Sequence, residues 1–247
     1  MQKLFAMQKF RATILSTRPV EEQLIKEAAK QNIKIDVLPF IATEPIDRLE
    51  IYNEIENALS QTATVVFTSM NAVDAVAAHL HDYKPDWKIY CIGNTTRKLV
   101  AQYFGNGLIA GTGKDATGLA EKIIEDDNSD EVVFFCGDKR RDELPLLLRE
   151  NDIEVNEIEV YETRSVHHNI NKIYDGILFF SPSAVESFFS TNKVDARTIL
   201  FAIGNTTATE IKKYAVNKVV ISDEAGEKNL VQKAIKFFDK NRIDIDN

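Results

Sequence analysis

Short apolar stretches alternate with longer amphipathic ones along most of the chain. The apolar stretches are dense in Val, Ile, Phe and Tyr, as buried strands are, and the segments between them have helical spacing of apolar residues. Strands are predicted at 12–15, 33–41, 63–67, 87–92, 131–135, 155–161, 176–180, 198–203 and 219–221. Helices are predicted at 21–31, 46–59, 73–81, 95–104, 119–125, 142–151, 184–190, 206–214 and 230–238. Alternation of strand and helix is typical of parallel sheets flanked by helices, so the predicted fold class is α/β.

The two halves of the chain repeat the same motifs in the same order. Phe67-Thr-Ser-Met-Asn-Ala-Val73 matches Phe179-Phe-Ser-Pro-Ser-Ala-Val185, and Ile92-Gly-Asn-Thr-Thr96 recurs as Ile203-Gly-Asn-Thr-Thr207. Each copy is long enough to hold several strands, and could form its own sheet. The sequence therefore predicts a duplicated α/β unit and two similar lobes.

Two extended runs, 37–43 and 158–163, match each other at a different spacing from the motifs above. If both cross between the lobes, they pair as a two-stranded connection and one lobe is built from both ends of the chain. Two consecutive lobes would fit the residue pattern equally well.

Composition excludes several classes of protein. The 247 residues are 44% hydrophobic and 28% charged, as in globular proteins, and no segment has the about 20 apolar residues of a membrane span. The net charge of −8 has the wrong sign for a broad basic field that would hold nucleic acid or anionic lipid. Only Cys91 and Cys136 are present, and residues 1–13 do not read as a signal peptide. We expect a cytoplasmic monomer without nucleic-acid or membrane partners.

The two Gly-Asn-Thr-Thr turns are candidate anion sites. Each follows a predicted strand and opens a predicted helix, where free amides and the helix dipole favour negative charge. Asn94 and Asn205 can cap these helices, and the hydroxyls of Thr96 and Thr207 belong to the first turns. Ligands of open α/β sheets bind beyond the carboxyl ends of strands, which is where these turns lie. Ordinary capped turns are the alternative.

Further polar residues follow other predicted strands. Ser69, Ser181 and Ser183 open helices and are interpreted as caps and hydrogen-bond donors, since no nucleophile elbow accompanies them. Arg18 could pair with carboxylates of a ligand or could be a solvated turn residue. The segment 137–141 holds Lys139 and Arg141 in the matching place, and the pattern does not decide whether Arg141 or Lys139 contacts a ligand. 

No cofactor or metal site is predicted. Gly111-Thr-Gly-Lys114 lacks the spacing and the hydroxyl residue of a phosphate-binding P-loop, and no dinucleotide fingerprint follows a strand. The histidines lack the spacing of metal ligands.

Taken in order, the motifs resemble uroporphyrinogen-III synthases over nearly the whole chain. The motifs are Leu15-Ser-Thr-Arg-Pro19, Phe67-Thr-Ser-Met-Asn-Ala-Val73, the two Ile-Gly-Asn-Thr-Thr turns, Val160-Tyr-Glu-Thr163 and Phe180-Ser-Pro-Ser183. The resemblance implies two α/β lobes joined by a two-stranded connection, with one discontinuous lobe of residues 1–38 and 163–247 and a second lobe of residues 39–162.

The resemblance also implies a reaction. Such enzymes cyclise linear hydroxymethylbilane to uroporphyrinogen III without a cofactor, with loss of water and inversion of ring D, in heme biosynthesis. Tyr161 matches the family's functional tyrosine and is the candidate proton donor, while Thr96, Thr207, Ser69 and Ser181 are similar to its substrate-contacting hydroxyls. 

Two other interpretations fit the same residues. A two-lobed protein could bind a polyanionic small molecule without chemistry, with Tyr161 only a wall of its site. An inactive family member could serve as an interaction module.

Overall fold

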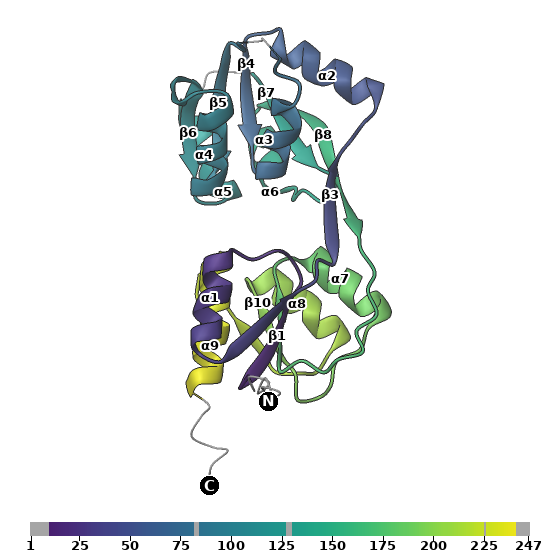
Figure 1. The fold of residues 1–247 in the computed structure, drawn as a ribbon. Coiled ribbons are helices and arrows are strands. Elements are labelled where there is room, and N and C mark those ends of the chain that lie inside the picture. The colour runs from purple at the N-terminus through teal and green to yellow at the C-terminus, as the bar shows by residue number, and fades with distance from the viewer. Residues whose placement is uncertain (1–9, 82–83, 127–129, 225, 241–247) are drawn as a thin grey trace, which may run out of the picture. The chain divides into compact units, whose positions relative to one another are not determined.

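The computed structural model describes residues 10–81, 84–126, 130–224 and 226–240 (Figure 1). The chain divides into two compact units. Unit 1 takes the described residues up to Ala42 and those from Arg164 onward, and unit 2 is Thr43–Thr163. The chain passes between the units twice, inside β3 (Ile41–Pro45) and inside β8 (Glu154–Ser165).

Strands β3 and β8 are hydrogen-bonded neighbours in one sheet. The Ile46 amide donates to the Val160 carbonyl (3.0 Å) and the Val166 amide to the Phe40 carbonyl (2.9 Å), so the two segments run antiparallel. The single strand predicted at 33–41 is wrong, because the chain forms β2 (Ile33–Val37) and then β3 in a different sheet. Pro39 lies between them, where the chain leaves the extended run, while the Leu38 and Phe40 amides still donate to the Ser16 and Thr17 carbonyls (3.0 and 3.1 Å).

Unit 1 is a parallel sheet with helices on both faces. Its strand order is β11-β10-β9-β1-β2. The other strands are β1 (Ala12–Ser16), β9 (Gly176–Phe179), β10 (Ile199–Ala202) and β11 (Val219–Ile221). One face packs on α1 (Glu22–Lys30) and α9 (Glu227–Lys240), which lie side by side although they come from opposite ends of the chain (Figure 1). The other face packs on α7 (Pro182–Thr191) and α8 (Asn205–Tyr214).

Unit 2 has the strand order β3-β8-β7-β4-β5-β6. Its further strands are β4 (Ala63–Phe67), β5 (Trp87–Ile92), β6 (Ile109–Gly113) and β7 (Glu131–Gly137). One face packs on α2 (Leu49–Leu59), α3 (Met70–Ala77) and α4 (Gly93–Tyr103), the other on α5 (Ala116–Asp126) and α6 (Glu143–Arg149). A 3₁₀ turn, η1, covers Asn106–Leu108. Helices cover both faces of this sheet because successive side chains of its strands point to opposite faces. Along β4, Val65 and Phe67 pack in one core and Val66 packs in the other.

The two sheets place equivalent strands in the same spatial order. The order β11-β10-β9-β1-β2 in unit 1 corresponds to β6-β5-β4-β7-β8 in unit 2, and strands that carry the same repeated motif occupy the same place. Chain order differs, because β1 and β2 precede unit 2 while their counterparts β7 and β8 follow β4 to β6. This permutation explains why the sequence repeats at two different spacings. The α/β fold class with two helix-flanked parallel sheets is confirmed.

Strand β6 was not predicted from the sequence. Its residues include Gly111 and Gly113, which lower strand propensity, and it is an edge strand. A Cβ at Gly113 would lie 2.5 Å from the Leu119 amide nitrogen, so this glycine permits the close approach of α5. The glycine-rich segment therefore has a packing role that accounts for its resemblance to a phosphate loop.

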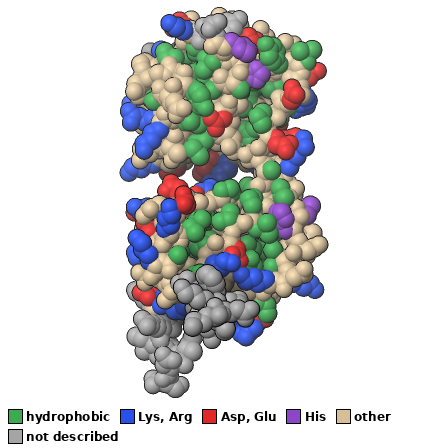
Figure 2. All heavy atoms as spheres, viewed as in Figure 1, with side chains coloured by type: hydrophobic (Ala, Val, Ile, Leu, Met, Phe, Trp, Pro, Cys, Tyr) green, Lys and Arg blue, Asp and Glu red, His purple; other side chains and the backbone are tan. Residues whose placement is uncertain are grey.

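Charged side chains of both signs lie among one another on the face shown in Figure 2. Within the described residues, no helix is both long and apolar enough to cross a bilayer.

Candidate active site

The carboxyl ends of three strands in unit 2, β4, β5 and β7, meet at one edge of the sheet, beside Tyr161 within β8. Strand β4 is parallel to β5 and β7, with Phe67 opposite both Cys91 and Phe135, and β7 is parallel to β8, with Gly137 opposite Tyr161. The residues that follow these strand ends therefore share one edge, where ligands of α/β sheets bind.

Serines open α3 and α7 in the same way. The Ser69 hydroxyl accepts from the Ala72 amide and the Ser181 hydroxyl from the Ala184 amide, both at 3.2 Å. The predicted capping roles are confirmed, and Pro182 is the first residue of α7. Ser183 is half-buried in the first turn of α7. Since each cap uses an oxygen lone pair, the hydroxyl proton remains available to another acceptor.

Tyr161 is half-buried and forms a side-chain hydrogen bond with Ser69. Burial raises the pKa of the Tyr161 phenol above its ordinary value; the Ser69 bond opposes this shift, and the nearby Cys136 and Asp138 add to it. The phenol therefore keeps its proton at neutral pH. A protonated phenol at the ligand-binding edge of a sheet can donate that proton to a leaving oxygen.

The Gly-Asn-Thr-Thr turns differ from the sequence prediction. Helix α4 begins at Gly93 and α8 at Asn205, and neither has a side-chain cap. The predicted capping by Asn94 and Asn205 is wrong, because both residues lie inside the first helical turn, with exposed side chains, rather than before it. Gly93 has φ of +72°, which favours glycine at this turn. The first-turn amides of α4 and α8 therefore lack the side-chain oxygen that caps α3 and α7.

The second threonine of each turn is buried. Thr96 is 6% exposed and Thr207 is 3% exposed. Neither hydroxyl has a hydrogen-bond partner among the residues that the structure describes. Neither oxygen is among the fully buried side-chain atoms that lack a partner in the described chain, so each hydroxyl is open to a partner from outside.

Arg18 lies at the carboxyl end of β1 but already has partners. Its guanidinium stacks on Phe180 (4.4 Å to the ring centroid) and its Nη2 lies 2.7 Å from a carboxylate oxygen of Glu227. The other Glu227 oxygen accepts from the Glu21 amide at 2.7 Å. Sequence reasoning missed Glu227, since only the tertiary packing of α1 and α9 brings the first turn of α9 to Arg18.

The segment after β7 carries the other candidate cations. Lys139 and Arg141 are exposed, whereas Arg140 forms ion pairs with Asp142 and Glu157. Arg140 is therefore part of the packing of unit 2.

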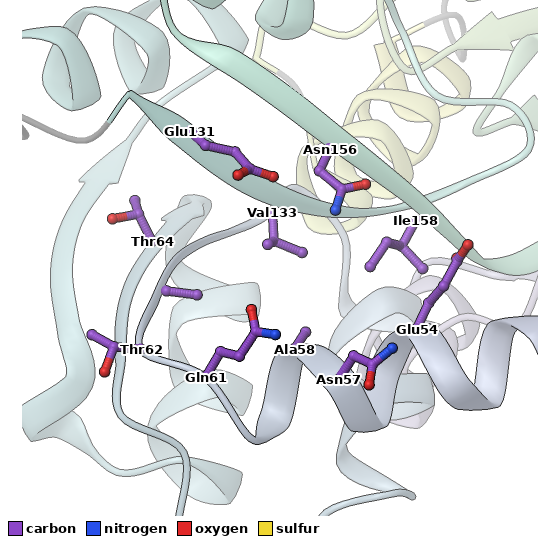
Figure 3. A pocket seen from close by; sticks show the side chains of 11 residues that line it. Glu54, Asn57, Ala58, Gln61, Thr62, Thr64, Glu131, Val133, Asn156 and Ile158 are labelled. Carbon is purple, nitrogen blue, oxygen red and sulfur yellow. The ribbon is translucent and has the colours of Figure 1, made fainter.

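A hollow of about 370 Å³ opens elsewhere in unit 2 (Figure 3). Thr64 near the start of β4 and Glu131 at the start of β7 line it, so it lies toward the opposite edge of the sheet from Tyr161. Glu54 from α2 adds a second carboxylate. Two carboxylates repel an anion, so this hollow does not suit an anionic ligand.

Other groups with possible chemistry are occupied or inert. Burial raises the pKa of the Cys91 thiol to about 11 and of the Cys136 thiol to about 12, so neither is a thiolate at neutral pH. Across the described segments, no three His, Cys, Asp or Glu side chains are grouped as metal ligands.

Comparison with known proteins identifies the family. The family model for uroporphyrinogen-III synthase HemD matches residues 22–232. The chain belongs to the uroporphyrinogen-III synthase family. The family resemblance predicted from the ordered motifs is confirmed.

Curated relatives of this uroporphyrinogen-III synthase family member include two named proteins. The porphyrin biosynthesis protein HemD of Ruminiclostridium josui is 26% identical over 262 residues, which cover 95% of this chain and 50% of that protein. The uroporphyrinogen-III synthase of Saccharomyces cerevisiae is 23% identical over 79% of this chain and 83% of its own length. The chain thus spans half the length of the first relative.

Solved structures of uroporphyrinogen-III synthases share the fold. The Helicobacter pylori enzyme has a TM-score of 0.68 at 15% identity and covers 92% of this chain and 99% of its own. A mutant of the Thermus thermophilus enzyme has a TM-score of 0.60 at 14% identity, with 94% and 100% covered. At these identities the likeness shows the fold and leaves the site residues as predictions.

Proposed function

We propose that this chain is a uroporphyrinogen-III synthase that converts hydroxymethylbilane to uroporphyrinogen III. The observation that carries the proposal is the half-buried phenol of Tyr161, which lies against Gly137 at the carboxyl edge of the sheet in a chain of this family. The predicted monomeric state, cytoplasmic location and absence of a cofactor belong to the same proposal, as do lobes with bounds 1–38 and 163–247 against 39–162.

The substrate carries acetate and propionate groups on every pyrrole ring. A protein of net charge −8 must hold them by local geometry, and the first turns of α4 and α8 offer amides without side-chain caps. One such turn lies in each unit, and its second threonine is a buried residue. These features support a role for Asn94, Thr96, Asn205 and Thr207 in carboxylate binding.

The proposed chemistry needs little from the protein beyond one proton and correct folding of the substrate. The terminal C–O bond of the bilane breaks, and the leaving hydroxyl takes the phenolic proton of Tyr161 and departs as water. The pyrrole nitrogen supplies the electron pair that expels it. Ring D then attacks through a spiro intermediate, is inverted, and the macrocycle closes with release of a proton, which restores the Tyr161 phenol. Substrate positioning selects this route over direct closure.

The test of the function is product identity. The purified protein, treated to remove metal ions, receives freshly generated hydroxymethylbilane, and the uroporphyrinogen isomers are resolved after oxidation. Spontaneous closure leaves ring D uninverted and yields isomer I, so excess isomer III is the expected result. Isomer I alone, from folded protein, would favour the binding-protein interpretation.

The hydroxyls of Thr96 and Thr207 give a separate prediction about binding. Thr96→Val and Thr207→Val are each expected to raise KM about tenfold, since a hydrogen bond to a charged group contributes about 1.5 kcal/mol. The melting temperature should stay within about 2 °C of wild type, because in the described chain neither hydroxyl has a hydrogen-bond partner that the substitution would leave unpaired. A lower melting temperature with unchanged KM would instead assign these hydroxyls to the fold.

The raised pKa of Tyr161 predicts the alkaline side of the pH profile. Burial disfavours the phenolate, so the proton donor stays intact. Deprotonation of Tyr161 should therefore not lower kcat between pH 7 and about 10. Above about pH 10 the unfolded state releases this proton more readily than the folded state, so the free energy of unfolding falls. Measurement of kcat against pH, with Tyr161→Phe as reference, checks this; a Tyr161-dependent midpoint near pH 8 would contradict it.

A further inference from the structure

Strand β8 contains an irregularity immediately before Tyr161. Along the β7–β8 ladder Cys136 pairs with Glu159, yet the next residue, Gly137, pairs with Tyr161. Val160 is therefore an extra residue in β8, which is a β-bulge. Bulges bend a strand and redirect the side chains that follow.

The bulge changes the face on which Tyr161 lies. Adjacent residues of a regular strand point to opposite faces of the sheet. Here Val160 and Tyr161 both pack against the same apolar cluster, the one formed with α2, α3 and α4. Ser69, at the start of α3, lies on this face and bonds to the phenol. The bulge thus brings the phenol to Ser69.

Gly137 leaves the space that the redirected ring occupies. A Cβ at Gly137 would lie 2.3 Å from Cζ of Tyr161 and 2.8 Å from its hydroxyl oxygen. Gly137 is buried, and it is not among the residues with positive φ, so its backbone conformation does not require glycine. The requirement for glycine comes from the Tyr161 ring.

Asp138 holds the backbone on both sides of the phenol. Its amide donates to the Tyr161 carbonyl at 3.2 Å, and its carboxylate oxygen Oδ1 accepts from the Thr163 amide at 2.8 Å. These two bonds continue the ladder beyond the bulge and fix the segment that bears Tyr161.

We propose that Gly137 and Asp138 are positioning residues that hold the Tyr161 phenol beside Ser69 for proton donation. The part of this inference that concerns catalysis rests on the proposed function. The geometry of the phenol does not, and it can be measured in the free protein.

The first experiment places a methyl group under the ring. Gly137→Ala is expected to lower kcat at least about tenfold with KM within about twofold, and to cause no further loss in the Tyr161→Phe background, because the proton donor is already absent there. Gly107→Ala is the matched control, since its Cβ would meet nothing within 4 Å. Equal losses in both backgrounds, or wild-type activity, would overturn the positioning role.

The second readout needs no substrate. Alkaline absorbance titration of each protein, with the matching Tyr161→Phe protein subtracted, isolates the phenol of Tyr161. In Gly137→Ala the pKa of this phenol should fall toward its ordinary value, because the ring loses its buried site. An unchanged titration curve would overturn the inference. If the isomer assay finds no synthase activity but the curve shifts, the proposed function fails while the geometry stands.

Asp138 provides the variant that keeps the test decisive if Gly137→Ala does not fold. Asp138→Asn retains an oxygen acceptor for the Thr163 amide and Asp138→Ala removes it, while both remove the carboxylate charge. The Ala variant should have several-fold lower kcat than the Asn variant, and a lower phenol pKa, because its phenol is less well held. Identical kcat and identical titration curves for the two variants would overturn the positioning role of Asp138.

Discussion

Tyr161→Phe is expected to lower the turnover number for uroporphyrinogen III formation by about 10²–10⁴-fold, the range that general acid catalysis contributes. Product affinity should stay within about threefold, because only the hydroxyl is lost and the ring remains. The measurements are single-turnover formation of isomer III and equilibrium binding of uroporphyrinogen III.

The fold should tolerate this substitution. A Phe ring fills the same space over Gly137, and Ser69 keeps its bond from the Ala72 amide, so α3 remains capped. The phenol has a high pKa because it is buried, and removal of a neutral group leaves no buried charge behind. A loss of turnover can therefore be attributed to the missing proton donor.

Tyr52→Phe is the matched control for Tyr161→Phe. Tyr52 is an exposed phenol on α2 of the same unit, so this variant should keep wild-type turnover. If Tyr161→Phe cyclises the bilane at the wild-type rate, Tyr161 is a wall of the site and another group, or water, supplies the proton.

Local pattern was sufficient for much of this fold. The bounds predicted for β4, β5 and β11 agree with the structure, because each is a compact apolar stretch between helices. Ser69 and Ser181 could be predicted as caps, since capping depends on neighbours three residues away. The errors came where a single residue ends an extended run that is otherwise apolar, as Pro39 does between β2 and β3. They also came where glycines lower the strand propensity of a true strand, as in β6.

The site depends on contacts that no local pattern contains. Glu227 reaches Arg18 only because α1 and α9 pack together, and the Asn side chains failed as caps because their helices begin one or two residues earlier than capping requires. One signal was present and was missed: Ile158, Val160 and Tyr161 break the alternation of a regular strand, which indicates a bulge. That signal, with Gly137 at the end of the neighbouring strand, could have predicted where the Tyr161 phenol lies.

Asn94→Asp combined with Asn205→Asp should separate binding from stability most clearly. Both side chains are exposed in the first turns of α4 and α8, and Asp is nearly the same size as Asn. A carboxylate in a first helical turn stabilises the helix by about 0.3–1 kcal/mol through the dipole. The same carboxylate repels an anionic substrate group a few ångströms away by about 1–3 kcal/mol, and so weakens affinity roughly 5- to 150-fold per site.

Opposite changes in stability and affinity are the distinguishing result. KM should rise by at least about 25-fold for the double variant and recover in part as salt screens the added charges, while the melting temperature stays level or increases. Asn57→Asp, on an exposed position of α2 beside the hollow of Figure 3, adds the same charge away from the carboxyl edge and should leave KM unchanged. If the double variant binds hydroxymethylbilane as wild type does, the first turns of α4 and α8 are not its carboxylate sites. The burial of Thr96 and Thr207 would then be a property of the fold alone.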